Sequence, residues 1–159
     1  VFEPACIPTM LPGDRVVDAP LETPTGTVLV TAVSMGNPHA IIWVDDVDAA
    51  PLETVGPFVE RHDAFPNGTN VEFAQIVDDR TVRLRVWERG VGETLACGTG
   101  ASATGVAAAA SGRTGRETTV VLPGGDLRIA WADDDHVYMA GSASVSFTGS
   151  IDLGEDVAE

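Results

Sequence analysis

One segment, residues 98–110, constrains the fold more than any other part of the chain. It reads Gly-Thr-Gly-Ala-Ser-Ala-Thr-Gly-Val-Ala-Ala-Ala-Ala, so small residues occupy every face and no position carries a charge. A helix without a polar face is normally enclosed by the rest of the protein, and small side chains allow other segments to approach its backbone closely. The segment therefore predicts a central helix wrapped by a sheet.

Most of the remaining chain has the pattern of β-strands. The predicted strands comprise residues 26–34, 40–44, 71–77, 81–87, 118–122, 126–131 and 137–147. Gly36-Asn37-Pro38-His39 is predicted to break the chain between the first two, and residues 71–87 to form a hairpin. In its second strand apolar residues alternate with Arg83, Arg85 and Trp87, which predicts one dry and one largely cationic face.

These elements predict a single α+β domain over residues 1–159. A chain of this length can bury a sizeable core, and it contains no internal repeat or linker that would divide it. Residues 52–61 follow Pro51 and have an amphipathic spacing, which predicts a second helix despite the internal Gly56-Pro57.

Composition excludes several classes of function. Asp and Glu number 24 against 9 basic residues, a net charge of −15, which makes nucleic acid an improbable partner. All nine basic residues are Arg, so this chain cannot form a lysine Schiff base or a P-loop. No apolar run approaches a membrane span, and the first residues lack the pattern of a secretory signal. Two cysteines provide neither a disulfide framework nor a set of zinc ligands, as is typical of a cytoplasmic protein.

Cys97 is the strongest candidate for chemistry. It immediately precedes the small-residue helix, so Gly98, Thr99 and Gly100 would form the first turn, with unpaired backbone N–H groups beside the sulfur. This position favours a thiolate, and the same N–H groups could bind a carboxylate. The alternative is that Cys97 is a small buried apolar residue, as most free cysteines are.

Other candidates are ambiguous when each is considered alone. Glu88-Arg89 ends a predicted strand and offers a carboxylate and a bidentate guanidinium, but such pairs are common on exposed strand ends. Asn37 and Asn70 are ordinary turn residues, and an isolated His39 is more often a packing residue than a catalyst.

Taken together, these segments resemble the C-terminal part of the diaminopimelate epimerase family. The resemblance rests on Ser34-Met35-Gly36-Asn37-Pro38-His39, Asn70-Val71-Glu72-Phe73, Glu88-Arg89-Gly90-Val91-Gly92-Glu93-Thr94 and Ala96-Cys97-Gly98-Thr99-Gly100, in the family's order and spacing. It covers nearly the whole chain, and Leu122-Pro123-Gly124-Gly125 and Tyr138-Met139-Ala140-Gly141 look like later family segments.

The resemblance implies a cofactor-independent isomerase that interconverts LL- and meso-diaminopimelate, a step toward lysine and peptidoglycan. Two cysteines would act on opposite faces of the α-carbon, and Cys97 matches one of them. By the same resemblance His39 and Glu88 help to set its protonation, and Gly98 and Thr99 hold the substrate carboxylate. Asn37, Asn70, Glu88 and Arg89 would hold the remaining polar groups. The implied fold is a mixed sheet curled into a barrel-like roll around the central helix.

The family's second catalytic cysteine lies in an N-terminal half that we expect to be absent from this chain. Cys6 does not replace it, because Glu3-Pro4-Ala5-Cys6-Ile7-Pro8 has neither a glycine nor a helix start. We therefore expect the chain to be inactive alone, with the N-terminal half and diaminopimelate as partners, and a homodimer among the assemblies to consider. The alternatives are a carboxylate-binding remnant without chemistry and a one-cysteine redox protein. An uncovered apolar patch and self-association are also expected.

Overall fold

The computed structural model describes residues 1–152, which form one nine-stranded mixed sheet with two α-helices. The elements are η1 (Pro4–Cys6), β1 (Ala19–Thr23), β2 (Gly26–Ser34), β3 (Pro38–Trp43), α1 (Leu52–Glu60), β4 (Asn70–Asp78), β5 (Thr81–Glu88), β6 (Gly92–Thr94), α2 (Gly98–Ala110), β7 (Glu117–Leu122), β8 (Gly125–Trp131) and β9 (Val137–Gly141). The expected α+β class is confirmed. Among these residues, no helix combines the length and hydropathy that crossing a bilayer requires.

Each of the two α-helices lies in the connection between two parallel strands of the sheet. The strand order is β1-β2-β3-β4-β5-β7-β8-β9, with the short β6 paired to β5. β3 runs parallel to β4 and β5 runs parallel to β7, while every other pair is antiparallel. Parallel neighbours require a crossover, and α1 and α2 lie within these two connections.

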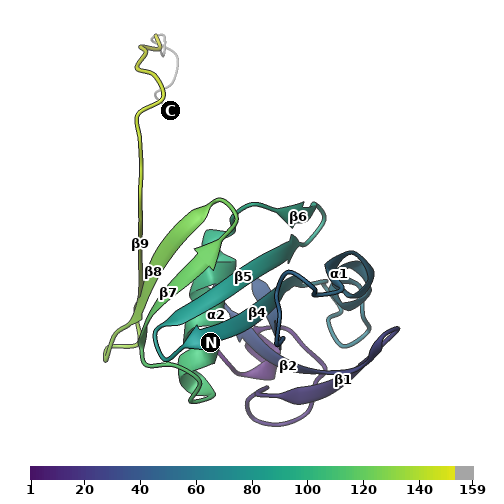
Figure 1. Cartoon of the computed structure of the whole chain (residues 1–159). Coiled ribbons are helices and arrows are strands. Elements are labelled where there is room, and N and C mark those ends of the chain that lie inside the picture. Colours follow the sequence, from purple (N-terminus) through teal and green to yellow (C-terminus); the bar gives the residue numbers. More distant parts are fainter. Residues whose placement is uncertain (153–159) are drawn as a thin grey trace, which may run out of the picture.

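The prediction of an enclosed central helix is confirmed. α2 contacts β2, β3, β4, β5, β7, β8 and β9, and Figure 1 shows it behind the strands in the middle of the sheet. Small residues make this contact possible. At Gly105 an added Cβ would lie 2.9 Å from Cγ2 of Ile129 in β8, which is closer than real side-chain contacts.

The two helices cover opposite faces of the sheet and define two cores. One core gathers Ala101, Ala103, Val106 and Ala107 of α2 with inward-facing residues such as Leu84 and Val86 of β5. The other gathers residues of α1 with Ala40, Ile42, Val71 and Phe73 of β3 and β4. The dry face predicted for β5 therefore packs against α2. Its opposite face carries Arg83 and Arg85, which pair with Asp48 and Glu93.

The sheet is open rather than closed. β1 and β9 form its two ends and are not paired with each other. The strand predicted over 137–147 ends at Gly141, and Figure 1 shows the following residues leaving the body as an extended segment. Since no described strand joins the two ends, closure of the expected barrel-like roll is not seen.

Several boundaries differ from those predicted. β3 begins at Pro38, so Pro38 and His39 belong to a strand and not to the break before it. The short elements η1, β1 and β6 were not predicted. α1 ends within one residue of its predicted limit and contains Pro57.

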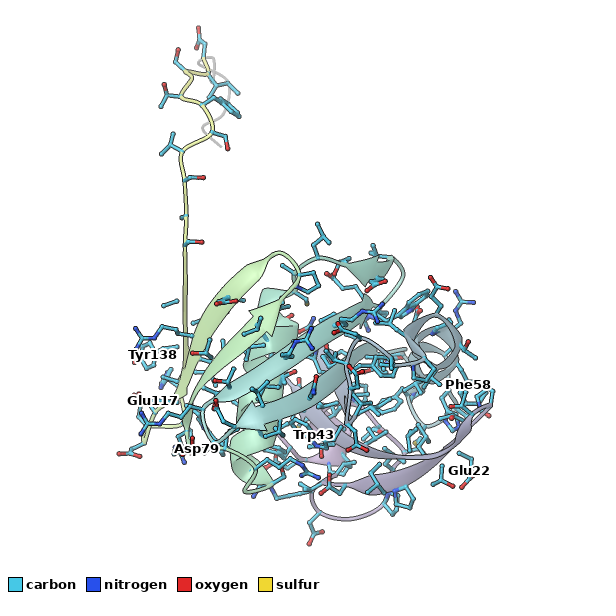
Figure 2. All side chains as sticks on the ribbon, in the orientation of Figure 1. Glu22, Trp43, Phe58, Asp79, Glu117 and Tyr138 are labelled. Carbon is cyan, nitrogen blue, oxygen red and sulfur yellow. The ribbon has the colours of Figure 1, made fainter. Side chains whose placement is uncertain are left out.

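Several apolar side chains are exposed among the described residues. Val145, Phe147 and Ile151 on the extended segment are largely exposed, and so are Val91 and Leu95 between β5 and α2. Figure 2 shows Tyr138 of β9, another exposed aromatic residue, on the opposite side of the view from Phe58 of α1.

Candidate active site

Five elements bring the predicted site residues to one end of the sheet. β3 and β4 run parallel and both begin there, with His39 in register with Asn70. β5 runs antiparallel to β4 and ends there at Glu88, where β6 pairs with its last residues. α2 begins at the same end, after Cys97. The strand directions therefore gather residues that are up to 62 positions apart in the sequence.

Cys97 is the N-cap of α2, as the sequence predicts. Its backbone is extended, with φ −138° and ψ 108°, and its Sγ accepts a hydrogen bond from the N–H of Gly100 at 3.4 Å. The hydroxyl Oγ1 of Thr99 lies 3.6 Å from the same sulfur. Only 9% of the residue is exposed. The sulfur thus lies at the edge of the core, in contact with the N–H of Gly100 and the hydroxyl of Thr99.

The pKa of Cys97 does not follow the prediction that its position at the helix terminus favours a thiolate. Burial raises the pKa of the thiol above its ordinary value, and the negative charges of Glu88 and Glu72 raise it further. The hydrogen bonds from Thr99 and Gly100 act in the opposite direction but do not outweigh burial. The raised pKa favours the neutral thiol over the thiolate.

His39 forms a buried pair with Glu72, a residue to which the sequence assigned no role. Nδ1 of His39 lies 2.6 Å from Oε1 of Glu72, and both side chains have no exposed surface. Burial raises the pKa of the Glu72 carboxyl, while the neighbouring His39 lowers it. The sequence did contain a signal, because Glu72 places a carboxylate within the strand Asn70-Val71-Glu72-Phe73-Ala74, between apolar residues.

Asn37 connects the His39 ring to the first turn of α2. Its Oδ1 lies 3.0 Å from Nε2 of His39, and its Nδ2 donates to Oγ1 of Thr99 at 3.3 Å. Asn37 is half-buried and Thr99 is exposed, so this connection reaches the surface beside Cys97.

Asn70 joins the neighbouring strands through its side-chain amide. Its Nδ2 donates to the carbonyl of Pro38 at 2.9 Å, and its Oδ1 accepts from the N–H of Arg89 at 2.9 Å. One amide hydrogen and one lone pair remain for a ligand. The Arg89 guanidinium is exposed and donates to the carbonyl of Asn67. Glu88 accepts from the hydroxyl of Thr94 at 2.6 Å.

A second carboxylate that the sequence analysis missed supports the Glu88-Arg89 turn. Glu60, at the end of α1, is buried and accepts from Nε1 of Trp87 at 2.7 Å and from the N–H of Gly90 at 2.9 Å. α1 therefore holds the end of β5 in place.

The start of α2 has the properties of an anion site. Gly100 donates to the Cys97 sulfur, and the N–H groups of Gly98 and Thr99 come before that of Ala101, the first to donate within the helix. The helix dipole adds positive potential at these groups. A cleft of about 990 Å³ lies elsewhere, along β7, β8 and β9, and is not lined by Cys97.

Comparisons with known proteins identify relatives of this chain. The family model described as diaminopimelate epimerase matches residues 31–146. A diaminopimelate epimerase of Synechococcus elongatus is 53% identical over 154 residues, which are 96% of this chain and 55% of that protein. One from Pelotomaculum thermopropionicum is 53% identical over 143 residues, covering 90% of this chain and 51% of that protein. The chain spans about half the length of these curated relatives.

Solved structures show the same fold at low identity. A hydroxyproline epimerase from Agrobacterium vitis aligns with a TM-score of 0.55 at 20% identity, over 72% of this chain and 40% of that one. A probable proline racemase from Agrobacterium radiobacter aligns with a TM-score of 0.53 at 18% identity, over 72% of this chain and 41% of that one. Because the matched family model extends over most of the sequence and includes every predicted site residue, the chain belongs to the diaminopimelate epimerase family.

Proposed function

We propose that this chain supplies half of the active site of an epimerase that interconverts LL- and meso-diaminopimelate without a cofactor. The observation that carries the proposal is the position of Cys97 as the N-cap of α2, at the end of the sheet that also holds His39 and Glu88. The second cysteine would come from the part of the curated relatives that this chain does not span.

The reaction requires a base and an acid on opposite faces of the α-carbon. An amino acid's α-hydrogen is very weakly acidic, so both groups must be held in place against the carbon in a site that excludes water. A thiolate on the other half would remove the α-proton, and Cys97 as a thiol would donate a proton to the opposite face. The roles exchange in the reverse direction. The raised pKa of Cys97 suits the proton-donating role in the resting chain.

Negative charge develops on the substrate carboxylate as the α-proton leaves. The N–H groups of Gly98 and Thr99, together with the dipole of α2, would stabilise this charge. Such fixed dipoles replace the electron sink that a cofactor ring would supply. Small residues in this turn allow the carboxylate to approach the backbone.

The other polar groups of the substrate would be held by side chains around this turn. Asn37 and Asn70 each retain hydrogen-bonding capacity, Glu88 can bind an ammonium group, and the exposed Arg89 guanidinium suits a carboxylate. Glu88 and His39 would help to set the protonation of Cys97.

The test is proton exchange by an assembled pair of halves. This chain is mixed with a separately produced N-terminal half of a close relative, and deuterium entering diaminopimelate from heavy water is followed. We expect exchange from the pair and none from either half. Cys97→Ser should abolish exchange, while Cys6→Ser, at an exposed position, should retain it. An assembled pair that binds diaminopimelate without exchange would favour a carboxylate-binding remnant.

The remaining expectations belong to the same proposal. The assembled enzyme would act in the cytoplasm on the route to lysine and peptidoglycan. The barrel-like roll would be a property of the assembled enzyme, and a homodimer is one assembly to examine by sedimentation.

A further inference from the structure

A continuous hydrogen-bonded chain leads from the interior of the sheet to the candidate thiol. It runs from Oε1 of Glu72 to Nδ1 of His39 at 2.6 Å and from Nε2 of His39 to Oδ1 of Asn37 at 3.0 Å. It continues from Nδ2 of Asn37 to Oγ1 of Thr99 at 3.3 Å, and from Thr99 to Sγ of Cys97 at 3.6 Å. Every link of this chain is a side-chain contact.

The inner end of this chain is sealed from solvent. Glu72 has no exposed surface, and its Oε2 has no hydrogen-bond partner of normal geometry among residues 1–152. Gly100 of α2 closes over the carboxylate, since a Cβ at that position would lie 2.9 Å from Oε1. A buried carboxylate must be paired or protonated, so the state of Glu72 is tied to His39.

We propose that Glu72 is a positioning residue for Cys97, because it fixes the direction in which hydrogen bonds are donated from His39 through Asn37 and Thr99 to the sulfur. This inference deepens the proposed function, since it rests on Cys97 being the reactive group.

In one direction, the chain donates toward the sulfur. Oδ1 of Asn37 can accept only if Nε2 of His39 carries a hydrogen, and Nδ2 of Asn37 then donates to Thr99. The hydroxyl hydrogen of Thr99 is left to donate to Sγ, which stabilises a thiolate. The Glu72–His39 pair then holds one proton beyond the ring N–H at Nε2, on either Nδ1 or the carboxyl, and its net charge is zero.

In the other direction, the chain donates away from the sulfur. If the pair gives one proton to the sulfur, the ring proton that remains lies on Nδ1 and donates to ionised Glu72, so Nε2 has only a lone pair. The Asn37 amide must then turn over, so that Nδ2 donates to Nε2 and Oδ1 accepts from Thr99. Thr99 can now only accept from the S–H group, which favours the thiol. The first state has one proton fewer on the sulfur and one more on the Glu72–His39 pair than the second state, so both states hold the same number of protons.

The charged groups around this hydrogen-bonded chain also favour a thiolate when the Glu72–His39 pair is neutral. Glu88 from β5 and Glu72 from β4 are the carboxylates whose charges act on Cys97, and Glu88 also acts on Glu72. A thiolate is therefore less unfavourable when the pair is neutral than when it carries a net charge of −1. Burial raises the pKa of Glu72, which helps the pair to keep its extra proton.

The test is the rate at which iodoacetamide alkylates Cys97, measured on this polypeptide without an N-terminal half. Cys6→Ala is introduced first, so that one thiol remains. If Glu72 acts only through its charge, Glu72→Gln removes a repelling carboxylate and should speed alkylation by the same factor whether or not Asn37 is present. If Glu72 acts through the hydrogen-bonded chain, the effect of Glu72→Gln should depend on Asn37, by about tenfold, the size of a charge-assisted hydrogen bond.

Two further variants separate the explanations. Asn37→Leu breaks the chain without touching the sulfur or changing a charge, and should slow alkylation by about tenfold. Adding Glu72→Gln to it should then change the rate far less than in the parent protein, whereas a charge that acts through space would still speed alkylation. Glu88→Gln, which acts through charge, should speed alkylation. Circular dichroism and the unfolding midpoint identify variants that fail to fold, and Asn37→Leu, at a half-buried position, decides the question if Glu72→Gln is one of them.

An effect of Glu72→Gln that is the same with and without Asn37, or an unchanged rate in Asn37→Leu, would overturn this inference. Neither result would affect the proposed epimerase, because alkylation requires no diaminopimelate and no second half. Conversely, an assembled enzyme without exchange could still show the coupled alkylation rates.

Discussion

Gly100 lies in the first turn of α2, directly against the buried carboxylate of Glu72. A Cβ at this position would lie 2.9 Å from Oε1 of Glu72 and 3.3 Å from both Cβ and Sγ of Cys97. Oε1 cannot move away freely, because it is bonded to His39 and the side chain has no exposed surface. Gly100→Ala should therefore destabilise the fold even though alanine favours helix.

The size of the effect follows from two opposing contributions. Replacing glycine by alanine within a helix normally stabilises it by about 1 kcal/mol. Forcing an extra methyl group into a well-packed core costs about 1–3 kcal/mol. Since the added methyl would also strain the bond between Glu72 and His39, we expect a net loss of about 1–2 kcal/mol in the free energy of unfolding.

Urea unfolding followed by tryptophan fluorescence measures this loss. Gly115→Ala is the matched control, because an added Cβ there meets nothing within 4 Å, and it should stay within about 0.5 kcal/mol of the parent chain. In a Glu72→Ala background the cost of Gly100→Ala should disappear. If Gly100→Ala instead stabilised the chain like an ordinary helical substitution, the described packing of Glu72 against α2 would be wrong.

Three further measurements examine other parts of the structure. Burial raises the pKa of Cys97, so the stability that this thiol contributes is present below the ordinary thiol pKa of 9.0 and is lost as pH rises through its pKa in the folded protein. Alkaline destabilisation should therefore be smaller in Cys97→Ala than in Cys6→Ala, and equal pH profiles would contradict this. Glu60→Gln should cost about 1–3 kcal/mol in urea unfolding, whereas Glu53→Gln, exposed on the same helix, should cost less than about 0.5 kcal/mol, and equal losses would refute the role of Glu60. Light scattering should show concentration-dependent self-association that Phe147→Ser reduces, and a monomer at every concentration would argue against it.

Local patterns predicted much of the fold. The bounds of β2 and α2 coincide with their predicted limits, because a run of β-branched residues and a run of small residues have few alternative structures. The N-cap position of Cys97 follows from the same boundary. The sequence did not predict where β9 ends, because the alternation that suggests a strand continues to Phe147, after the last pairing partner.

Properties that depend on packing between distant segments could not be predicted. The helix terminus suggested a thiolate at Cys97, but the burial that raises its pKa comes from strands far away in the sequence. Similarly, His39 and Glu72 are 33 residues apart and meet through the parallel pairing of β3 with β4. Periodicity identifies a strand but not its neighbour. In the sequence, the only sign of this pair was therefore the Glu72 carboxylate within an apolar run.

The enclosure of α2 has a consequence for folding kinetics. Its glycines weaken it as an isolated helix, and its contacts extend from β2 to β9, which lie at nearly opposite ends of the described chain. A helix of this kind gains stability only after most strands have paired, and such non-local topologies fold slowly. The environment of the Cys97 sulfur should therefore form late, so that a thiol-reactive probe would distinguish the native state from compact intermediates that already contain much of the sheet.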